Sequence, residues 1–277
     1  MYNFVKKANL ICPESYKSET INLDFHTIPH FGDKSKLEKN WVGTRHKAMK
    51  GALTFLAQDA ASKRLTYTNS DILKKDASGE IIEFTKHWLK LKGIVKETLV
   101  FDSKLTTYEK LSELNESKIK FITLRRRDEN LVETALTIDG SKWKTIDLKI
   151  PKRKFPKFRV YEERISLNKY KGEVRQLIIR DHGRKNPTFI VTNNFDLKIN
   201  KIIEIYAKRW RIENTIAELV HFFSLNSLSS PILLRIHFDV LLTVIAHTLY
   251  RMLASDLESV DEYTSSRLYN SKELRSQ

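Results

Sequence analysis

Apolar residues recur at helical spacing between Lys201 and Phe223, a stretch that contains neither glycine nor proline. On a wheel of about 100° per residue the apolar side chains share one broad arc, which predicts a single surface helix with one face in a core. The apolar arc holds Ile202, Ile205, Ile212, Ile216, Leu219, Val220 and Phe223. The opposite side holds Glu204, Lys208, Arg211, Asn214, Thr215 and Glu218.

Two charged residues interrupt the apolar arc. Arg209 and Glu213 fall near its middle with Tyr206 beside them, and their i, i+3, i+7 spacing places all three on one face of a helix. A buried carboxylate is costly unless it is paired or binds a metal. The pattern predicts either a structural Arg209–Glu213 ion pair or a metal-binding Glu213, and the helix alone does not decide between them.

A strict alternation of apolar and polar residues from Ile21 to Ile28 predicts a β-strand. Asp24 lies on its polar face, flanked by Asn22 and His26. Aspartate is disfavoured inside strands, so its presence requires either an edge strand with a solvated face or a functional role.

A second aspartate follows a short, continuous apolar run from Thr98 to Phe101, which is typical of a strand buried on both faces. Asp102 ends this run, and the carboxyl end of a buried strand faces the crevice in which α/β sheets place ligands. The spacing of apolar residues predicts a helix from Ser103 to Leu114. Asp102 suits both a ligand-binding role and the N-cap of that helix.

The remaining pattern predicts alternating strands and helices. Ala48 to Asp59 is interpreted as a strand or a short helix. Further strands are predicted at Arg64–Thr68, Lys120–Leu124 and Thr188–Thr192, and helices at Gly79–Lys92 and Leu233–Leu253. From Lys142 to Arg180 several short alternating runs, separated by prolines and a glycine, predict a β-rich insert.

The charge of the chain indicates what kind of partner it binds. The chain has 49 Lys and Arg against 34 Asp and Glu, a net charge of +15 and a pI near 9.7. This balance favours a polyanion, nucleic acid before an anionic membrane, although a bias toward solubility would look the same. Residues 149–185 hold thirteen Lys and Arg against four Asp and Glu. Phe155, Phe158 and Tyr161 lie among them, where they suit either DNA contact or a core.

Other sequence features narrow the protein class. Cys12 is the only cysteine, so neither a disulfide framework nor a zinc cluster is expected, and a reducing compartment suits the chain. No secretory signal opens the sequence. The longest apolar run, Val240 to Ala254, is interpreted as too short and too polar to span a bilayer.

Three carboxylates therefore occupy positions suited to chemistry. Asp24 lies in a strand, Asp102 ends a buried strand, and Glu213 lies on a helix predicted to be partly buried. Such a trio can hold Mg²⁺, which prefers oxygen ligands, and two ions about 4 Å apart can promote in-line phosphoryl transfer. Arg209 and Tyr206 would then hold a DNA phosphate beside the metals.

These residues resemble the three catalytic blocks of bacterial and archaeal insertion-sequence DDE transposases. The blocks are Asp24 in LDFHTIPHFG, Asp102 in LVFDSKLTTYEKLSEL and Glu213 in YAKRWRIEN. The third block matches Y-x2-R-x3-E at Tyr206, Arg209 and Glu213, and the resemblance extends over residues 21–254. It implies an α/β fold with a ribonuclease H-like mixed sheet, flanked by helices, and a β-rich insertion before the last catalytic helix.

The resemblance also implies an activity. Asp24, Asp102 and Glu213 would be the catalytic and metal-binding residues, with Mg²⁺ as cofactor and Mn²⁺ as a substitute. The reaction would be cut-and-paste transposition on double-stranded DNA, at transposon ends and in target DNA, by a homodimer on paired ends. No membrane partner is expected, and the location would be the prokaryotic cytoplasm at the nucleoid. Further DNA-binding residues are predicted at Tyr206, Arg209, Arg125, Arg126, Arg127, Lys152, Arg153 and Lys154.

The predicted organisation has four parts. Residues 1–20 form an N-terminal extension, residues 21–135 and 186–254 the catalytic core, residues 136–185 the basic β-rich insertion, and residues 255–277 a polar tail.

Two departures from the family pattern stand out. The signature lysine falls at Val220, and the short N-terminal extension leaves no room for a helical DNA-recognition region. The alternatives are a truncated or decayed remnant that binds DNA without catalysis, and a related nuclease without strand transfer.

Overall fold

The computed structural model describes residues 18–31, 37–148, 156–227, 230 and 232–256. The predicted DNA contacts Lys152, Arg153 and Lys154 lie outside these residues, as do Cys12, Phe155 and most of the predicted polar tail. By their internal contacts the residues form two compact units. The first unit contains Phe25–Lys74 and the chain from Arg211 onward, and the second contains Glu19–Asp24 and Lys75–Trp210. The domain limits expected from the sequence remain a prediction.

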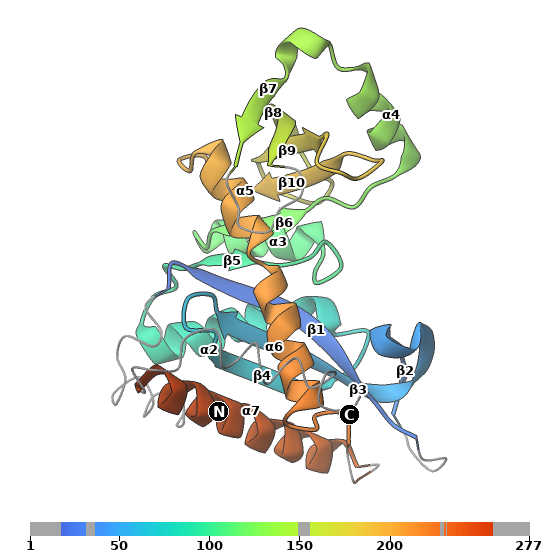
Figure 1. Ribbon diagram of the computed structural model, residues 1–277, viewed down its shortest axis with the longest axis vertical. Coiled ribbons are helices and arrows are strands. Elements are labelled where there is room, and N and C mark those ends of the chain that lie inside the picture. Colours follow the sequence, from blue (N-terminus) through green and yellow to red (C-terminus); the bar gives the residue numbers. More distant parts are fainter. Residues whose placement is uncertain (1–17, 32–36, 149–155, 228–229, 231, 257–277) are drawn as a thin grey trace, which may run out of the picture. The chain divides into compact units, whose positions relative to one another are not determined.

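The described part of the chain begins with four strands, continues with helices that alternate with single strands, and ends with four further strands and three helices (Figure 1). The strands are β1 (Thr20–Pro29), β2 (Lys39–Val42), β3 (Lys47–Asp59), β4 (Leu65–Ile72), β5 (Thr98–Val100), β6 (Phe121–Leu124), β7 (Lys144–Asp147), β8 (Lys157–Ser166), β9 (Glu173–Arg180) and β10 (Thr188–Thr192). The helices are α2 (Glu80–Lys92), α3 (Tyr108–Glu116), α4 (Glu129–Thr137), α5 (Ile199–Ala207), α6 (Trp210–His221) and α7 (Leu233–Asp256).

The strands form a mixed sheet in the order β2-β3-β1-β5-β6-β10-β9-β8-β7, with β4 paired to β3. β1, β5 and β6 are parallel neighbours, whereas β10, β9, β8 and β7 pair antiparallel. The sheet and its helices confirm the predicted α/β class. The predicted β-rich insert is confirmed as β7, β8 and β9, and the 48–59 segment is a strand.

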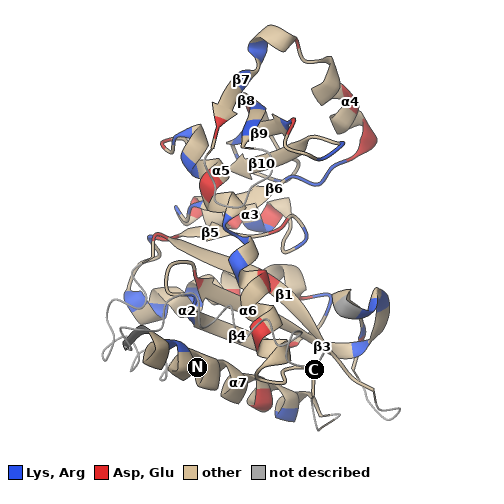
Figure 2. Ribbon diagram, in the orientation of Figure 1, with Lys and Arg blue, Asp and Glu red and all other residues tan. Residues whose placement is uncertain are grey.

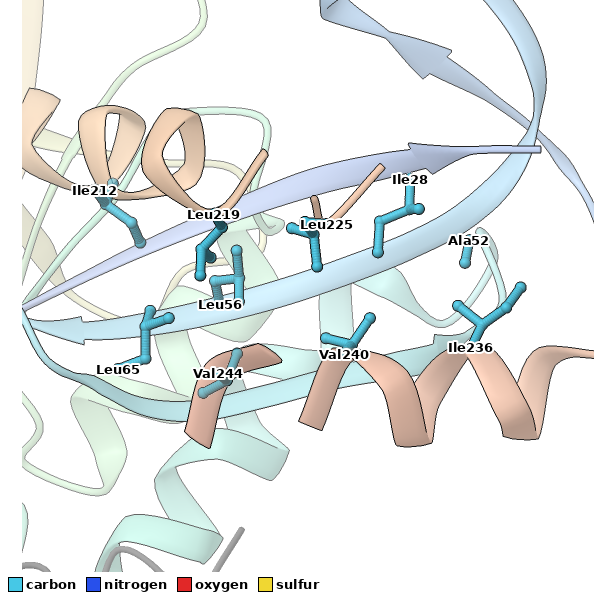
Figure 3. Close-up of a cluster of buried hydrophobic side chains, with 10 residues drawn as sticks. All are labelled: Ile28, Ala52, Leu56, Leu65, Ile212, Leu219, Leu225, Ile236, Val240 and Val244. Carbon is cyan, nitrogen blue, oxygen red and sulfur yellow. The ribbon is translucent and has the colours of Figure 1, made fainter. Parts of the chain in front are cut away.

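In the first unit α6 and α7 pack on the strands. Figure 3 shows side chains of both helices pointing toward those of β1, β3 and β4. Ile212 and Leu219 of α6 and Val240 and Val244 of α7 are fully buried there. In the second unit Ile202 of α5 packs in the core formed by β6, β8, β9 and β10. Burial of these stripes explains why amphipathic sequences of modest intrinsic propensity form helices here.

α7 is long and apolar enough to cross a membrane when only its length and composition are considered, over Leu233–Ala254. One face of the helix nevertheless packs in the core of the first unit, and His247 and Thr248 are fully buried. Only 28% of its most apolar window is buried, so α7 packs in the core by one face, while apolar residues such as Leu234 and Phe238 are exposed.

The single helix predicted over 201–223 is wrong, because the chain leaves helical geometry at Lys208–Arg209. The Lys208 amide donates to the Glu204 and Ile205 carbonyl oxygens at 3.1 Å, and the Arg209 amide donates to the Tyr206 carbonyl at 3.0 Å. These tighter turns end α5 and restart the chain as α6 with a different phase.

The change of phase reverses part of the predicted burial. Glu213 is exposed rather than buried, whereas Thr215 and Glu218, predicted on the polar side, are 2% and 5% exposed. Both buried polar groups have partners: Gln58 donates to the Thr215 hydroxyl at 2.5 Å, and Arg251 pairs with Glu218. The burial predicted from the helical wheel was wrong because the wheel assumed one continuous helix over residues 201–223.

The helix predicted from Ser103 begins later, at Tyr108. Thr107 has extended backbone angles, and its hydroxyl accepts a hydrogen bond from the Lys110 amide, so Thr107 is the N-cap. The N-cap role considered for Asp102 is therefore wrong.

Gly51 of β3 lies against β1 so closely that a Cβ atom there would stand 2.5 Å from the Ile28 carbonyl oxygen. We expect Gly51→Ala to lower the free energy of unfolding by about 1–3 kcal/mol, because the backbone must shift to relieve this overlap. Urea unfolding followed by circular dichroism measures the change. Gly79→Ala is the matched control, since nothing lies within 4 Å of its added Cβ. Equal stability of the two variants would show that β1 and β3 can separate at no cost.

Candidate active site

Asp24 and Asp102 follow matching positions on two adjacent parallel strands. Asn22 of β1 lies opposite Val100 of β5. Asp24 lies two residues beyond Asn22, inside β1, and Asp102 lies two residues beyond Val100, just after the end of β5. The same register, continued by two residues, predicts that the two carboxylates lie side by side on one face of the sheet. Asp102 follows the carboxyl end of a parallel strand, where α/β sheets bind ligands.

The loop after β5 fixes one oxygen of Asp102. Its Oδ1 accepts hydrogen bonds from the Ser103 hydroxyl at 2.9 Å and from the Lys104 amide at 3.2 Å. Within the described part of the chain, the Oδ2 atom of Asp102 accepts no hydrogen bond. The side chain is thus held in place while one oxygen remains available to a ligand.

Asp24 is held by a cation of the same unit. Its Oδ2 lies 3.3 Å from the Arg209 Nη1, and the Asp24 side chain is 22% exposed. The Arg209 guanidinium also lies 5.9 Å from the centre of the Tyr206 ring. Arg209 and Tyr206 thus meet beside Asp24, a contact that the helical wheel, with its Arg209–Glu213 pair, did not suggest.

Arginines surround a pocket beside Asp102. The pocket has a volume of about 770 Å³ and lies where the loops after β5 and β6 meet the loop between β9 and β10. Leu124 and Phe189 contribute apolar lining. Its charged and polar lining comprises Asp102, Ser103, Lys104, Arg125, Arg126, Arg127, Arg184 and Thr188. The three arginines predicted from the sequence therefore share one pocket with a predicted catalytic carboxylate.

Neutral oxygens hold three of these guanidinium groups. Arg125 donates to the Gln176 side chain at 2.9 Å, Arg126 to the Ser103 carbonyl at 3.2 Å, and Arg127 to the Pro187 carbonyl at 3.4 Å. In the described residues no carboxylate forms an ion pair with any of the four pocket arginines. Their positive charge is positioned but not neutralised, which suits an anionic ligand such as phosphate.

Two pocket residues were missed in the sequence. Lys104 and Arg184 line the pocket, although neither stands next to a recognisable motif. Arg184 reaches it because β10 pairs antiparallel with both β6 and β9, which brings the β9–β10 loop to the end of β6. The excess of Lys and Arg over 149–185 includes Arg184, but charge alone could not single it out.

Glu213, the third predicted ligand, belongs to the first unit and lies in the first turn of α6. Its helix is anchored one turn later by Glu218, whose carboxylate pairs with Arg251 and lies 3.4 Å from the His247 Nε2. Burial alone would raise the pKa of Glu218, but the His247 hydrogen bond and the Arg251 charge outweigh it and lower that pKa. Burial also lowers the pKa of His247, consistent with a neutral ring that donates from Nε2.

The chemistry of the donors fits a hard divalent cation. Asp24 and Asp102 offer carboxylate oxygens from adjacent strands, and Mg²⁺ is bound through one or two carboxylates plus substrate phosphates. Among the described residues no group of three carboxylates, histidines or cysteines is close enough to hold a metal. Asp24 and Asp102 of the second unit are the carboxylates that would hold a metal here, with substrate oxygens as further ligands.

The comparisons with known proteins agree with this architecture. The family model described as the transposase DDE domain matches residues 19–249. The chain belongs to the DDE transposase family. No curated protein has a matching sequence.

A solved structure of this family type shares the fold. It is the piggyBac transposase in a synaptic complex with hairpin DNA, studied by electron cryo-microscopy, with a TM-score of 0.53 and 9% sequence identity. The match covers 87% of this chain and 48% of that transposase, so the chain spans about half of its length. This likeness confirms the ribonuclease H-like fold expected of a DDE transposase.

Val220 occupies the position of the family's signature lysine. Its side chain is partly buried and packs against the apolar core of the first unit. Neighbouring His221 is exposed. At this position the chain therefore has a core contact in place of a cation.

Proposed function

We propose that the protein is a DNA transposase that cleaves and joins DNA strands by metal-dependent phosphoryl transfer, in cut-and-paste transposition of an insertion sequence. The observation that carries this proposal is the pocket lined by Asp102 and four arginines, beside the parallel pair of β5 with β1, the strand that carries Asp24. Carboxylates for a cation and guanidinium groups for phosphate are the two components that phosphoryl transfer on DNA requires.

Each group has a role in this proposal. Asp24, Asp102 and Glu213 would hold Mg²⁺, for which Mn²⁺ would substitute. When bound, the metal activates the attacking oxygen and stabilises the leaving oxygen. Arg125, Arg126, Arg127 and Arg184 hold the DNA backbone by charge-assisted hydrogen bonds, because guanidinium groups match the geometry of phosphate.

Arg209 and Tyr206 are proposed to act on the substrate after it binds. In the free protein Arg209 neutralises Asp24. Arg209 and Tyr206, which lie beside Asp24, would hold a phosphate of the bound DNA next to that carboxylate. The working form is proposed to be a homodimer on two transposon ends, at the nucleoid of a prokaryotic cell.

One observation favours a second candidate, a transposase remnant that binds DNA without catalysis. Val220 provides no charge where the family pattern has a lysine. The pocket arginines do not depend on that position, so the remnant would keep its affinity for DNA and lose turnover.

The experiment that tests the proposal is nicking of a labelled duplex that carries the element's own flanking ends, with a target plasmid present. We expect nicks at the ends and joined products with Mg²⁺ or Mn²⁺, and neither with a chelator. Binding without any nicks would support the remnant instead, and nicks without joined products would support a nuclease. Because metal is added to and removed from the same protein, the chelated sample controls for contaminating nucleases that need no metal.

A further inference from the structure

The hairpin formed by β2 and β3 at one end of the first unit carries an unusual surface. We name Lys39–Lys50 the basic hairpin. From Lys39 to Gln58 the chain has four Lys and Arg and no Asp or Glu. Three of those cations, Lys39, Arg45 and Lys47, are exposed. Figure 2 shows the Lys and Arg positions gathered along this hairpin.

The residue pairs between the two strands show that the positive charge of the hairpin does not stabilise its fold. Lys39 lies directly opposite Lys50, and like charges at such a position destabilise a sheet. Trp41 lies opposite Ala48, a small residue that covers little of the indole, and the Trp41 side chain is 63% exposed. Neither pair stabilises the hairpin. The exposed lysine and tryptophan are therefore better explained by binding to a partner than by folding.

The hairpin is nevertheless firmly attached. Asn40 and Val42 point inward and are 5% and 1% exposed. The Asn40 amide donates to the Gly51 carbonyl at 3.1 Å. The exposure of Trp41 therefore does not result from loose packing, because its neighbours on the opposite face of β2 are buried.

A second aromatic residue extends the surface. Phe31, which follows β1, is 65% exposed, and the Arg45 guanidinium lies 5.8 Å from its ring centre. In the described part of the chain no carboxylate pairs with Lys39, Arg45 or Lys47. Exposed cations interleaved with exposed aromatic rings are typical of surfaces that bind nucleic acid.

β2 also lies at the edge of the sheet, where it pairs with β3 alone among the described strands. An open edge can pair with a second copy of the chain, but lysines on an edge strand oppose that pairing by repulsion. The charge therefore favours a polyanion over self-association.

We propose that the basic hairpin is a second DNA-binding surface, separate from the arginine pocket, which binds the phosphate backbone of duplex DNA through Lys39 and Arg45 and places Trp41 against it. The choice of DNA as the polyanion rests on the proposed function. The contact itself requires no catalysis, because it uses charge and exposed apolar surface only.

The test is the salt dependence of binding to a 30-base-pair duplex, by fluorescence anisotropy in a chelating buffer, with the full chain. The variant combines Lys39→Ala and Arg45→Ala. We expect the slope of log Kd against log salt to become shallower by about two, and affinity near physiological salt to fall about tenfold. The control, Lys75→Ala with Lys90→Ala, removes the same charge from the α2 region and should keep the wild-type slope.

A second measurement does not depend on deleting the hairpin charges. Trp88 and Trp143 are buried, and Trp210 is exposed, so Trp210→Phe leaves Trp41 as the exposed fluorophore. Duplex DNA should then protect the fluorescence from acrylamide quenching by about twofold or more, because stacked or covered indoles are shielded from solvent.

The proposal is overturned if the hairpin variant has the wild-type salt slope, or if DNA leaves the quenching unchanged. A Trp41→Ala variant that shifts the sedimentation of the DNA-free protein would assign the edge to self-association instead. Failure of the nicking reaction in the wild-type protein would reject the proposed transposase activity but would leave this result standing, since binding is measured without metal.

Discussion

Replacing Asp102 with asparagine is expected to lower the rate of metal-dependent nicking by at least about a thousandfold. The amide keeps the shape of the side chain, and its oxygen can still accept from Ser103 and Lys104, so the loop should keep its conformation. What is lost is the negative charge that holds a cation. The same loss is expected for Glu213→Gln if Glu213 is the third ligand.

DNA affinity should change little in the Asp102→Asn protein, because the pocket arginines remain and a nearby negative charge is removed. Single-turnover nicking and fluorescence anisotropy measure the two quantities separately. Asp128→Asn is the control, since Asp128 is an exposed aspartate of the same unit that caps α4 through the Leu131 amide at 2.7 Å. Nicking by the Asp102→Asn protein at the wild-type rate would remove Asp102 from the active site.

Replacing Arg251 with methionine is expected to destabilise the first unit by about 3–5 kcal/mol. Glu218 is 5% exposed and would lose its cationic partner, leaving only the hydrogen bond from a neutral His247. A buried carboxylate without compensation is the costliest single change available in this core. Urea unfolding measures the loss, and Arg235→Met is the control because Arg235 is an exposed arginine of the same helix.

A double variant separates the charge from the packing. Adding Glu218→Gln to Arg251→Met removes the buried charge, so a substantial part of the lost stability should return. If Arg251→Met alone costs less than about 1 kcal/mol, solvent reaches the Glu218 carboxylate and the buried pair does not anchor α6.

The local pattern of the chain determined most of its elements. Alternation in β1, the continuous apolar runs of β5 and β10, and the helical spacing of α2 and α7 all predicted what the structure contains. These elements follow from the sequence because burial of one face dictates the period of apolar residues. The pattern also predicted Asp24 and Asp102 as site residues, since a carboxylate inside or directly after a buried strand is unfavourable for stability; their role remains a prediction.

Prediction from the sequence failed where helix geometry or side-chain burial depends on residues far apart in the chain. It predicted one helix over 201–223, but two tight turns at Lys208–Arg209 reset the phase and exposed Glu213. Glu218 is buried because Arg251 of α7 neutralises it, and a partner so far along the chain leaves no trace in the local period.

The sequence by itself thus determined the fold class and the excess of positive charge, and it predicted the two strand carboxylates as site residues. Only the tertiary structure decided which charges act together. Parallel pairing made β1, which carries Asp24, a neighbour of β5, which precedes Asp102; antiparallel pairing carried Arg184 to the loop after β6, and an edge strand left Trp41 exposed. The physical reason is that hydrophobic periodicity is a local property, whereas a binding site is assembled from residues whose proximity depends on how strands pair.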